Sequence, residues 1–152
     1  MKRIIYVLLA VAFVLAGCRS QEAAVPQSNI PDDDVLTVSF GETERSYTRA
    51  DLEALGAVEV DNGEAVYIGV PLKTLLEDAG VDLASITTVK AIAVDGFSST
   101  YDSSIFLEEN TLVAYAKADG PLAPNEGNFR MVAPGLAGSL NARLLIRLEV
   151  IQ

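Results

Sequence analysis

Short stretches of apolar and β-branched residues recur along the chain after residue 34, a pattern typical of strands. The stretches 57–60 and 65–68 flank Asp61-Asn62-Gly63, whose Asn-Gly pair is typical of a hairpin turn. At the C-terminus, positions 144, 146, 148 and 150 are apolar and alternate with a mixed set, so we expect them to face the core. Strands are predicted at 35–40, 57–60, 65–68, 88–94, 111–116, 129–133 and 144–151.

Two helices interrupt these strands. Thr48 can cap the first, Asp51 lies in its first turn, and Gly56 supplies its stop. The second begins with Pro71 as its first helical residue and ends just before Gly80, with apolar residues at 72, 75, 76 and 79. Because strands outnumber helices, we expect the long loops at 96–104, 117–128 and 134–143 to carry any binding site.

The N-terminus has the pattern of a bacterial lipoprotein signal. Lys2 and Arg3 precede an apolar stretch at 4–16 that is too short to cross a bilayer of roughly 30 Å. Leu15-Ala16-Gly17-Cys18 resembles a lipobox, which predicts lipidation, palmitate included, at Cys18. We therefore divide the chain into a signal peptide (1–17), a lipidated cysteine with a flexible tether (18–34) and one domain (35–152). The alternatives are an ordinary secretory signal and an uncleaved anchor.

The charge balance narrows the classes of partner. The chain has 21 acidic and 11 basic residues and a net charge of −10. Loss of Lys2 and Arg3 with the signal, two positive charges, would make this −12. So acidic a surface argues against nucleic acid and against anionic lipid as partners.

The residue types also limit the chemistry. The chain has no histidine and one cysteine, which excludes a Ser-His-Asp or Cys-His arrangement, the usual zinc sites and any internal disulfide. A carboxylate pair such as Asp95 and Asp102 leaves acid–base chemistry open as an alternative. The segments 32–34 and 61–63 lack the regular ligand alternation of a calcium loop, and we interpret the three adjacent aspartates at 32–34 as solvated charge.

Five motifs, in order along the domain, resemble the landmarks of the molybdopterin-binding domain of the sulfite oxidase family. They are Tyr67-Ile68-Gly69-Val70-Pro71-Leu72 continuing to Val81, Ala93-Val94-Asp95-Gly96-Phe97, Leu112-Val113-Ala114-Tyr115, Gly120-Pro121-Leu122, and Gly127-Asn128-Phe129-Arg130-Met131-Val132-Ala133-Pro134-Gly135. The resemblance implies an α+β fold with a mixed β-sheet core and short peripheral helices.

The same resemblance carries an expectation about function. Enzymes of that family hold molybdenum through a cysteine thiolate and use histidine and lysine near the cofactor phosphate, whereas residues 35–152 contain neither cysteine nor histidine. A molybdenum cofactor and familiar redox catalysis are therefore not expected. The family also includes periplasmic pterin-binding lipoproteins that signal to membrane enzymes of cyclic-di-GMP turnover. This points to a lipid-anchored module that binds a metal-free pterin and signals to a membrane partner.

A pterin needs a platform for its faces and polar groups for its edge. Phe97 and Tyr101 would stack on it, with Ser98, Ser99 and Asp102 contacting its edge. Arg130 and Arg143 would make forked contacts with a carbonyl or phosphate, and Gly135 would allow close backbone approach. The predicted ligand-binding set is Phe97, Ser98, Ser99, Tyr101, Asp102, Arg130, Gly135 and Arg143.

Two alternative functions remain open. One is a molybdenum-cofactor oxidoreductase subunit with Ser98 or Asp102 as the metal ligand in place of cysteine. The other is a ligand-free protein-interaction domain. In each case we expect the domain at the bacterial cell envelope, facing the periplasm or cell exterior, with an inner-membrane signalling or redox protein as its partner. If the source is Gram-negative, Arg19 after the lipidated cysteine favours the outer membrane, an inference from resemblance alone.

Overall fold

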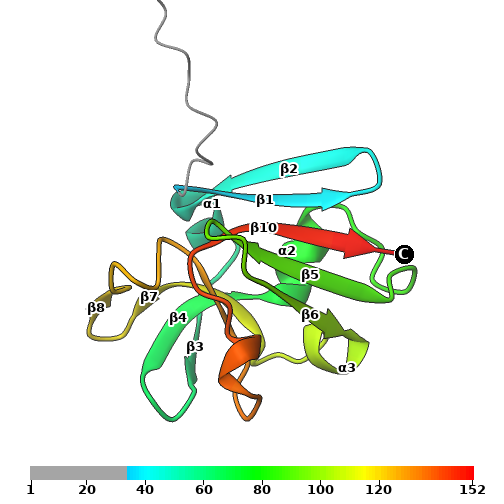
Figure 1. Ribbon diagram of the computed structural model, residues 1–152. Coiled ribbons are helices and arrows are strands. Elements are labelled where there is room, and N and C mark those ends of the chain that lie inside the picture. Colours follow the sequence, from blue (N-terminus) through cyan, green and yellow to red (C-terminus); the bar gives the residue numbers. More distant parts are fainter. Residues whose placement is uncertain (1–33) are drawn as a thin grey trace, which may run out of the picture.

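The computed structural model describes residues 34–152, which form two β-sheets with short helices (Figure 1). The predicted signal, Cys18 and most of the tether lie outside the described residues. The elements are β1 (Val35–Phe40), β2 (Thr43–Thr48), α1 (Arg49–Ala54), β3 (Val58–Asp61), β4 (Val66–Pro71), α2 (Leu72–Asp78), β5 (Thr88–Ala93), β6 (Ser98–Asp102), α3 (Ser103–Phe106), β7 (Leu112–Lys117), β8 (Gly120–Pro121), β9 (Arg130–Val132), the 3₁₀ turn η1 (Gly138–Leu140) and β10 (Leu145–Ile151).

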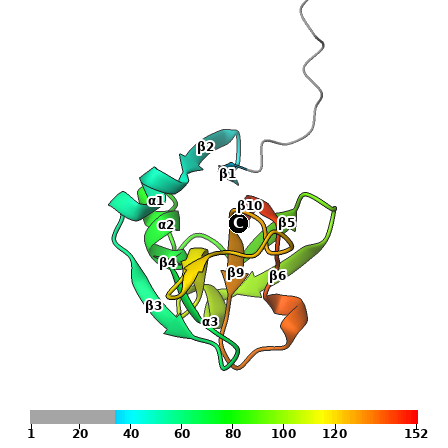
Figure 2. The ribbon, with the colours of Figure 1, turned by 90° about the vertical axis from the view of Figure 1, so that its left-hand side faces the viewer.

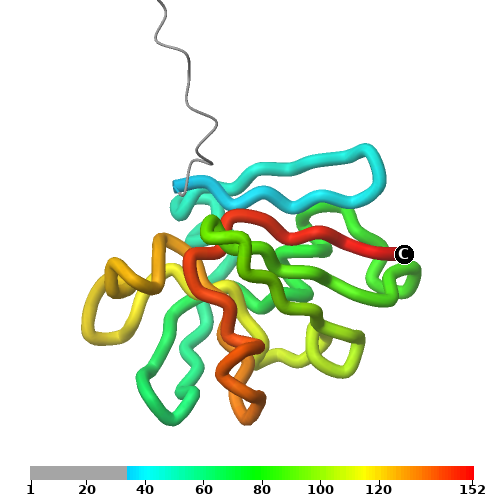
Figure 3. Tube along the Cα trace, viewed as in Figure 1, coloured from blue at the N-terminus to red at the C-terminus, as the bar shows by residue number. Residues whose placement is uncertain are grey.

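The first sheet has the strand order β2-β1-β10-β5-β6. β1 and β10 pair in parallel, and the other neighbours in this sheet are antiparallel. The first and last strands of the described chain therefore lie side by side, as the tube in Figure 3 shows. Because β10 lies between β1 and β5, the last strand of the chain holds the sheet together.

The second sheet has the order β3-β4-β7-β8, and β9 also pairs with β7. It packs against the first sheet around a core that includes Leu36, Val70 and Leu148, each fully buried. Figure 2 shows α1 and α2 along one side of the molecule, between β2 and β4. This mixed arrangement of sheets with few short helices confirms the α+β prediction.

Local sequence signals explain both predicted helices. The hydroxyl of Thr48 accepts a hydrogen bond from the Asp51 amide, and the Asp51 carboxylate accepts one from the Thr48 amide at 2.8 Å, a complete capping box. In α2, Leu72, Leu75 and Leu76 are fully buried, as their spacing predicts. Pro71 is the last residue of β4 and the N-cap of α2, so the prediction that it is the first helical residue was wrong by one position.

The inward face of β10 differs from the simple alternation predicted for it. Leu145, Leu148 and Val150 are buried, whereas Leu144 and Ile146 are only half-buried. The pairing of β10 with β5 shifts register between Leu145 and Arg147. A bulge of this kind turns the residues before it onto the opposite face, which is why the predicted pattern fails at the start of the strand.

Five elements were not predicted: β2, β6, α3, β8 and η1, the last two of which lie in the predicted loops at 117–128 and 134–143. β2 carries the polar sequence TERSYT along the edge of the first sheet, so it lacks the apolar alternation that marks a strand. The predicted loop at 96–104 contains β6 and the start of α3, because Ser98–Asp102 pairs along its full length with β5.

Among the described residues, no helix is long and apolar enough to cross a bilayer.

Gly69 marks the closest approach of β4 to β7. A Cβ atom at this position would lie 2.2 Å from the Val113 carbonyl oxygen and 2.6 Å from the Ala114 Cα. The pairing of the two strands also shifts register between Ile68 and Gly69. Because the obstructing atoms are backbone, a side chain here would force the strands apart.

We predict that Gly69→Ala lowers the free energy of unfolding by about 3 kcal/mol or more, since overpacking against backbone has no flexible side chain to relieve it. Urea unfolding followed by circular dichroism measures the change. Gly138→Ala is the matched control, because a Cβ there meets nothing within 4 Å. Equal stabilities of the two variants would contradict the close approach.

Candidate functional site

A pocket of about 160 Å³ opens between the β3–β4 hairpin and the segment that joins β9 to β10. We call it the arginine pocket, because Arg130 and Arg143 both line it. Its remaining lining residues are Asn62, Glu64, Ala133, Pro134, Gly135, Leu136, Gly138 and Asn141. The pocket thus brings together three residues that the sequence predicts as ligand-binding: Arg130, Gly135 and Arg143.

A second pocket of about 240 Å³ shares Glu64 and Arg143 with the first. We call it the lysine pocket, because Lys117 also lines it, together with Ala65, Tyr67, Ala123, Asn125 and Glu126. The two shared side chains stand at the junction of the pockets. A ligand held between them would therefore meet one acid and one guanidinium.

A larger pocket of about 390 Å³ lies near α1 and includes Arg49, Tyr115 and Phe129 in its lining. Its arginine is already engaged, since Arg49 forms an ion pair with Glu53 and lies over the Tyr115 ring. Of the predicted ligand-binding residues, none lines it. We therefore take the arginine pocket as the candidate site.

Hydrogen bonds hold the segment that forms the arginine pocket. The Asn141 side-chain oxygen accepts from the Ala133 amide at 2.8 Å, and the Ala142 carbonyl accepts from the Met131 amide at 2.8 Å. The segment is also supported from beneath by Tyr101, whose hydroxyl donates to the Leu140 carbonyl at 2.5 Å. The pocket wall is therefore fixed before any ligand arrives.

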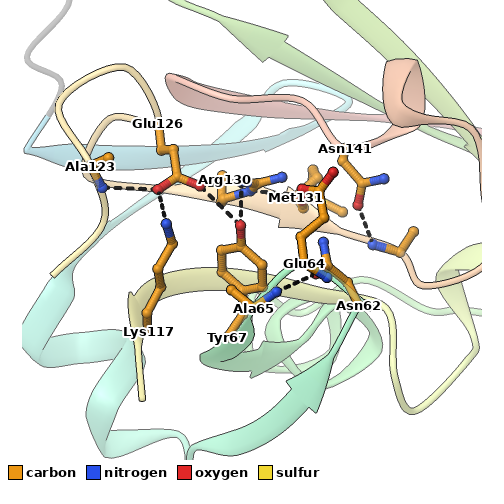
Figure 4. Close-up of polar contacts among 11 residues, drawn as sticks. Asn62, Glu64, Ala65, Tyr67, Lys117, Ala123, Glu126, Arg130, Met131 and Asn141 are labelled. Carbon is orange, nitrogen blue, oxygen red and sulfur yellow. Dashed lines mark hydrogen bonds and ion pairs between the residues drawn. The ribbon is translucent and has the colours of Figure 1, made fainter. Parts of the chain in front are cut away.

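Arg130 is buried, at 2% exposure, and its guanidinium is held from several directions (Figure 4). Nη1 donates to the Tyr67 hydroxyl at 2.7 Å and to the Glu126 carboxylate. The guanidinium carbon lies 4.5 Å from the centre of the Tyr67 ring, a cation–π distance. These contacts fix the position of Arg130 at the edge of the pocket and place an anion against its guanidinium.

The Glu126 carboxylate is the common acceptor of this network, and its residue is 4% exposed. Oε2 accepts from Lys117 Nζ at 2.6 Å and from the Ala123 amide at 2.9 Å. Oε1 accepts from the Tyr67 hydroxyl at 3.0 Å and from Arg130. One carboxylate thus compensates two cations and joins β4, β7, β9 and the loop before β9.

These contacts shift the pKa values of the network. Burial alone would raise the pKa of Glu126, but the hydrogen bonds from Lys117, Ala123, Tyr67 and Arg130 together lower it to about 2. The hydrogen bond to Glu126 raises the pKa of Lys117, and burial raises that of Tyr67. Glu126 and Lys117 are therefore both charged at neutral pH.

Arg143 differs from the other cations of the described chain. Seven of the eight Lys and Arg side chains in residues 34–152 form ion pairs with carboxylates: Arg45, Arg49, Lys73, Lys90, Lys117, Arg130 and Arg147. Within this part of the chain, Arg143 is the one that has no such partner. It is exposed and lines both pockets, so its hydrogen-bond donors are available to a ligand.

The other predicted ligand-binding residues lie outside the arginine pocket, on β6 and the turn before it. Phe97 is 42% exposed, and Ser98 is the exposed first residue of β6. Ser99 and Tyr101 point into the protein, where their hydroxyls lie 2.7 Å apart. Tyr101 is fully buried, and burial raises the pKa of its hydroxyl to about 12. The prediction of its ring as an open stacking platform is therefore corrected to a supporting role.

Asp102 also has a structural role. Its carboxylate caps α3 by accepting from the Ser104 amide at 2.9 Å and from the Ser104 hydroxyl at 2.5 Å. Neither Ser98 nor Asp102 lines the arginine pocket. The geometry thus gives no support to these two residues as metal ligands at this site.

Five further residues of the site were not predicted from the sequence: Glu64, Tyr67, Lys117, Glu126 and Asn141. Tyr67 and Lys117 are paired across β4 and β7, a neighbourhood that appears only with the sheet register. Glu126 precedes Arg130 by four residues, which is an available signal, but the intervening chain is not helical. Opposite charges at this spacing, with Glu126 in a predicted loop and Arg130 in a predicted strand, gave no reason to expect a buried pair.

Comparison with known proteins identifies the domain. Residues 35–152 match the family described as oxidoreductase molybdopterin binding domain. The chain belongs to this family. No curated protein matches the chain. Among solved structures, the molybdopterin-binding domain resembles a chain of the sulfane dehydrogenase SoxCD from Paracoccus pantotrophus, with a TM-score of 0.62 and 18% identity. The match covers 77% of this chain and 38% of the SoxCD chain, and it shows the fold alone.

The donor atoms of the domain do not fit molybdenum. A metal held by a pterin dithiolene favours a soft thiolate as its protein ligand, and residues 34–152 contain no cysteine. In the same range, no three histidine, cysteine or acidic residues are grouped so that they could hold a metal ion. The arginine pocket offers guanidinium, amide and backbone groups, which suit the polar edge of a pterin.

We predict that Glu126→Gln lowers the free energy of unfolding by about 3 kcal/mol at pH 7, because it leaves Lys117 and buried Arg130 without their anion. The folded-state pKa is depressed, so this stabilisation is full above the ordinary value of 4.5 and is lost as the pH falls toward 2. The difference in free energy of unfolding between wild type and Glu126→Gln should therefore shrink as the pH falls from 4.5 toward 2. Urea unfolding at several pH values measures it.

Glu149→Gln is the control for this experiment, because the Glu149 side chain is 42% exposed and its ion pair with Lys90 is long, at 3.9 Å. A surface pair of this kind contributes at most about 1 kcal/mol. If Glu126→Gln changed stability no more than Glu149→Gln at every pH, Glu126 would not be the anion that stabilises the site.

Proposed function

We propose that this protein is a lipid-anchored binding module of the cell envelope that holds a metal-free pterin in the arginine pocket and signals its presence to a membrane partner. The observation that carries the proposal is the unpartnered guanidinium of Arg143 at the mouth of a preformed pocket in a molybdopterin-binding domain. Residues 34–152 contain no cysteine thiolate, so the proposed ligand is a pterin without a bound metal.

The pocket has the groups that a pterin requires. The heterocycle has apolar faces and an edge of alternating donors and acceptors, so a suitable site combines apolar surface with a few directed polar groups. Pro134 and Leu136 contribute apolar surface, and Leu136 is 37% exposed. Arg130 and Arg143 provide donors for a carbonyl or an anionic substituent. The fixed wall lowers the entropic cost of binding.

The proposed absence of catalysis follows from the residues available. Family enzymes place a thiolate on molybdenum, and this domain would offer the metal only oxygen donors. Glu126, the buried carboxylate nearest the pocket, has its pKa lowered to about 2, so it is a poor general base at neutral pH. We therefore propose ligand binding without turnover.

The location and the partner belong to the same proposal. The lipobox-like tetrad ending at Cys18 would place the lipid only 17 residues before Val35, where the domain begins. A flexible tether of that length spans roughly 20–25 Å, so the pocket would lie close to the membrane that holds the lipid and within reach of a membrane partner there. The acidic domain adds no membrane attraction of its own.

We predict that the purified domain binds reduced or oxidised pterins with micromolar affinity, and that Arg143→Ala weakens this binding at least tenfold, because the variant removes forked hydrogen bonds worth about 1.5–3 kcal/mol. Isothermal titration calorimetry measures both constants. Arg147→Ala is the matched control, since Arg147 lines neither pocket and forms an ion pair with Glu44. Absence of binding up to high micromolar pterin would overturn the proposal.

We predict that the full chain expressed in bacteria incorporates labelled palmitate and sediments with membranes, and that Cys18→Ala abolishes both. The acylated cysteine is the proposed anchor, and each buried methylene contributes about 0.8 kcal/mol to membrane binding. Ser20→Ala is the control, because it alters the tether and leaves the tetrad intact. A Cys18→Ala protein that still sedimented with membranes would show that the lipid is not the anchor.

A further inference from the structure

The turn between β3 and β4 is fixed by its own side chains. Asp61 Oδ1 accepts from the Gly63 amide at 2.8 Å. Asn62 Oδ1 accepts from the amides of Glu64 at 3.0 Å and Ala65 at 3.1 Å. The Asn62 amide in turn donates to the Ala65 carbonyl at 3.2 Å. Glu64 is therefore carried by a rigid turn and not by a loose loop tip.

The Glu64 side chain lines both pockets at their junction. Figure 4 shows it extending from the hairpin turn toward Arg130, which lines the arginine pocket with it. Glu64 takes part in none of the seven ion pairs found among residues 34–152. Its carboxylate oxygens are thus available as acceptors, at the junction of the pockets that Arg143 also lines.

The opposite charges of Glu64 and Arg143 set a requirement on the ligand. An ionised carboxylate only accepts hydrogen bonds, and a guanidinium only donates them. The ligand must therefore present donors to Glu64 and an acceptor to the arginines. A 2-amino-4-oxo pteridine does so, since its 2-amino group and N3–H lie beside its 4-oxo group. A 2,4-dioxo pteridine, lumazine, replaces the amino group by a carbonyl and would place an acceptor against the carboxylate.

We infer that Glu64 is the residue that selects the aminopyrimidine edge of the ligand, and that the site discriminates 2-amino-4-oxo from 2,4-dioxo heterocycles. The inference rests on the proposed function and makes it more specific. A site built to accept hydrogen bonds from an amino group rejects the analogue that lacks it, because an acceptor that the bound ligand covers then stays unpaired. We expect the wild-type domain to bind pterin at least tenfold more tightly than lumazine.

The test is calorimetric titration of the domain, wild type and Glu64→Gln, with pterin and with lumazine. Glutamine keeps one acceptor and adds a donor for the lumazine 2-oxo group, so the preference should fall to about threefold or less. Glu59→Gln is the matched control, since Glu59 is an exposed residue of β3 in the same hairpin and lines neither pocket. It should keep the wild-type ratio.

The outcomes separate the two proposals. Pterin binding with the same ligand preference in wild type and Glu64→Gln would overturn the role of Glu64 and leave pterin binding standing. Equal affinity of the wild type for pterin and lumazine would also overturn the role of Glu64 and leave pterin binding standing. Absence of binding to either ligand would overturn both proposals. Thermal unfolding of each variant shows that it is folded, which is expected because Glu64 is exposed.

Discussion

The site depends on the compensation of two cations by the Glu126 carboxylate. Arg130 cannot lose its proton in a protein, so burying it beneath the pocket requires an anion in contact with it. That anion comes from a loop, and the loop is fastened to the start of β10: the Leu144 amide donates to the Glu126 carbonyl at 2.8 Å. Gly127, with φ of +80°, makes the approach possible, since a Cβ there would lie 2.8 Å from the Leu144 Cα. Sheet pairing, loop conformation and charge balance are therefore parts of one arrangement.

The features of the fold that the sequence predicts are those with local causes. The capping box at Thr48 and the apolar spacing of α2 act within one turn of helix, and both are present in the structure. β2 and the bulge in β10 have non-local causes: a polar edge strand forms because β1 offers it hydrogen bonds, and the bulge depends on the register with β5. No pattern within either segment contains that information.

The same distinction holds for the site. Arg130, Arg143 and Gly135 were predicted from a motif and its neighbouring loop, and they meet at one pocket because β9 and the segment after it are contiguous in the chain. The residues from Phe97 to Asp102 were predicted as a loop. In the structure, β6 pairs with β5, which turns alternate side chains inward and places Tyr101 in the core. Glu126, Lys117 and Tyr67 meet only through the second sheet, so their partnership requires the tertiary structure.

Charge distribution bears on the kind of ligand that fits. The domain is strongly acidic, and its long-range field repels anions, but this field is screened over about 8 Å at physiological ionic strength. Close contacts then decide binding, and Glu64 stands beside Arg143 at the junction of the pockets. A ligand with several negative charges would meet both the field and this carboxylate. A neutral heterocycle with donors on one side and an acceptor on the other satisfies both residues, so the charges of the site favour an unphosphorylated pterin over the phosphate-bearing molybdopterin for which the family is named.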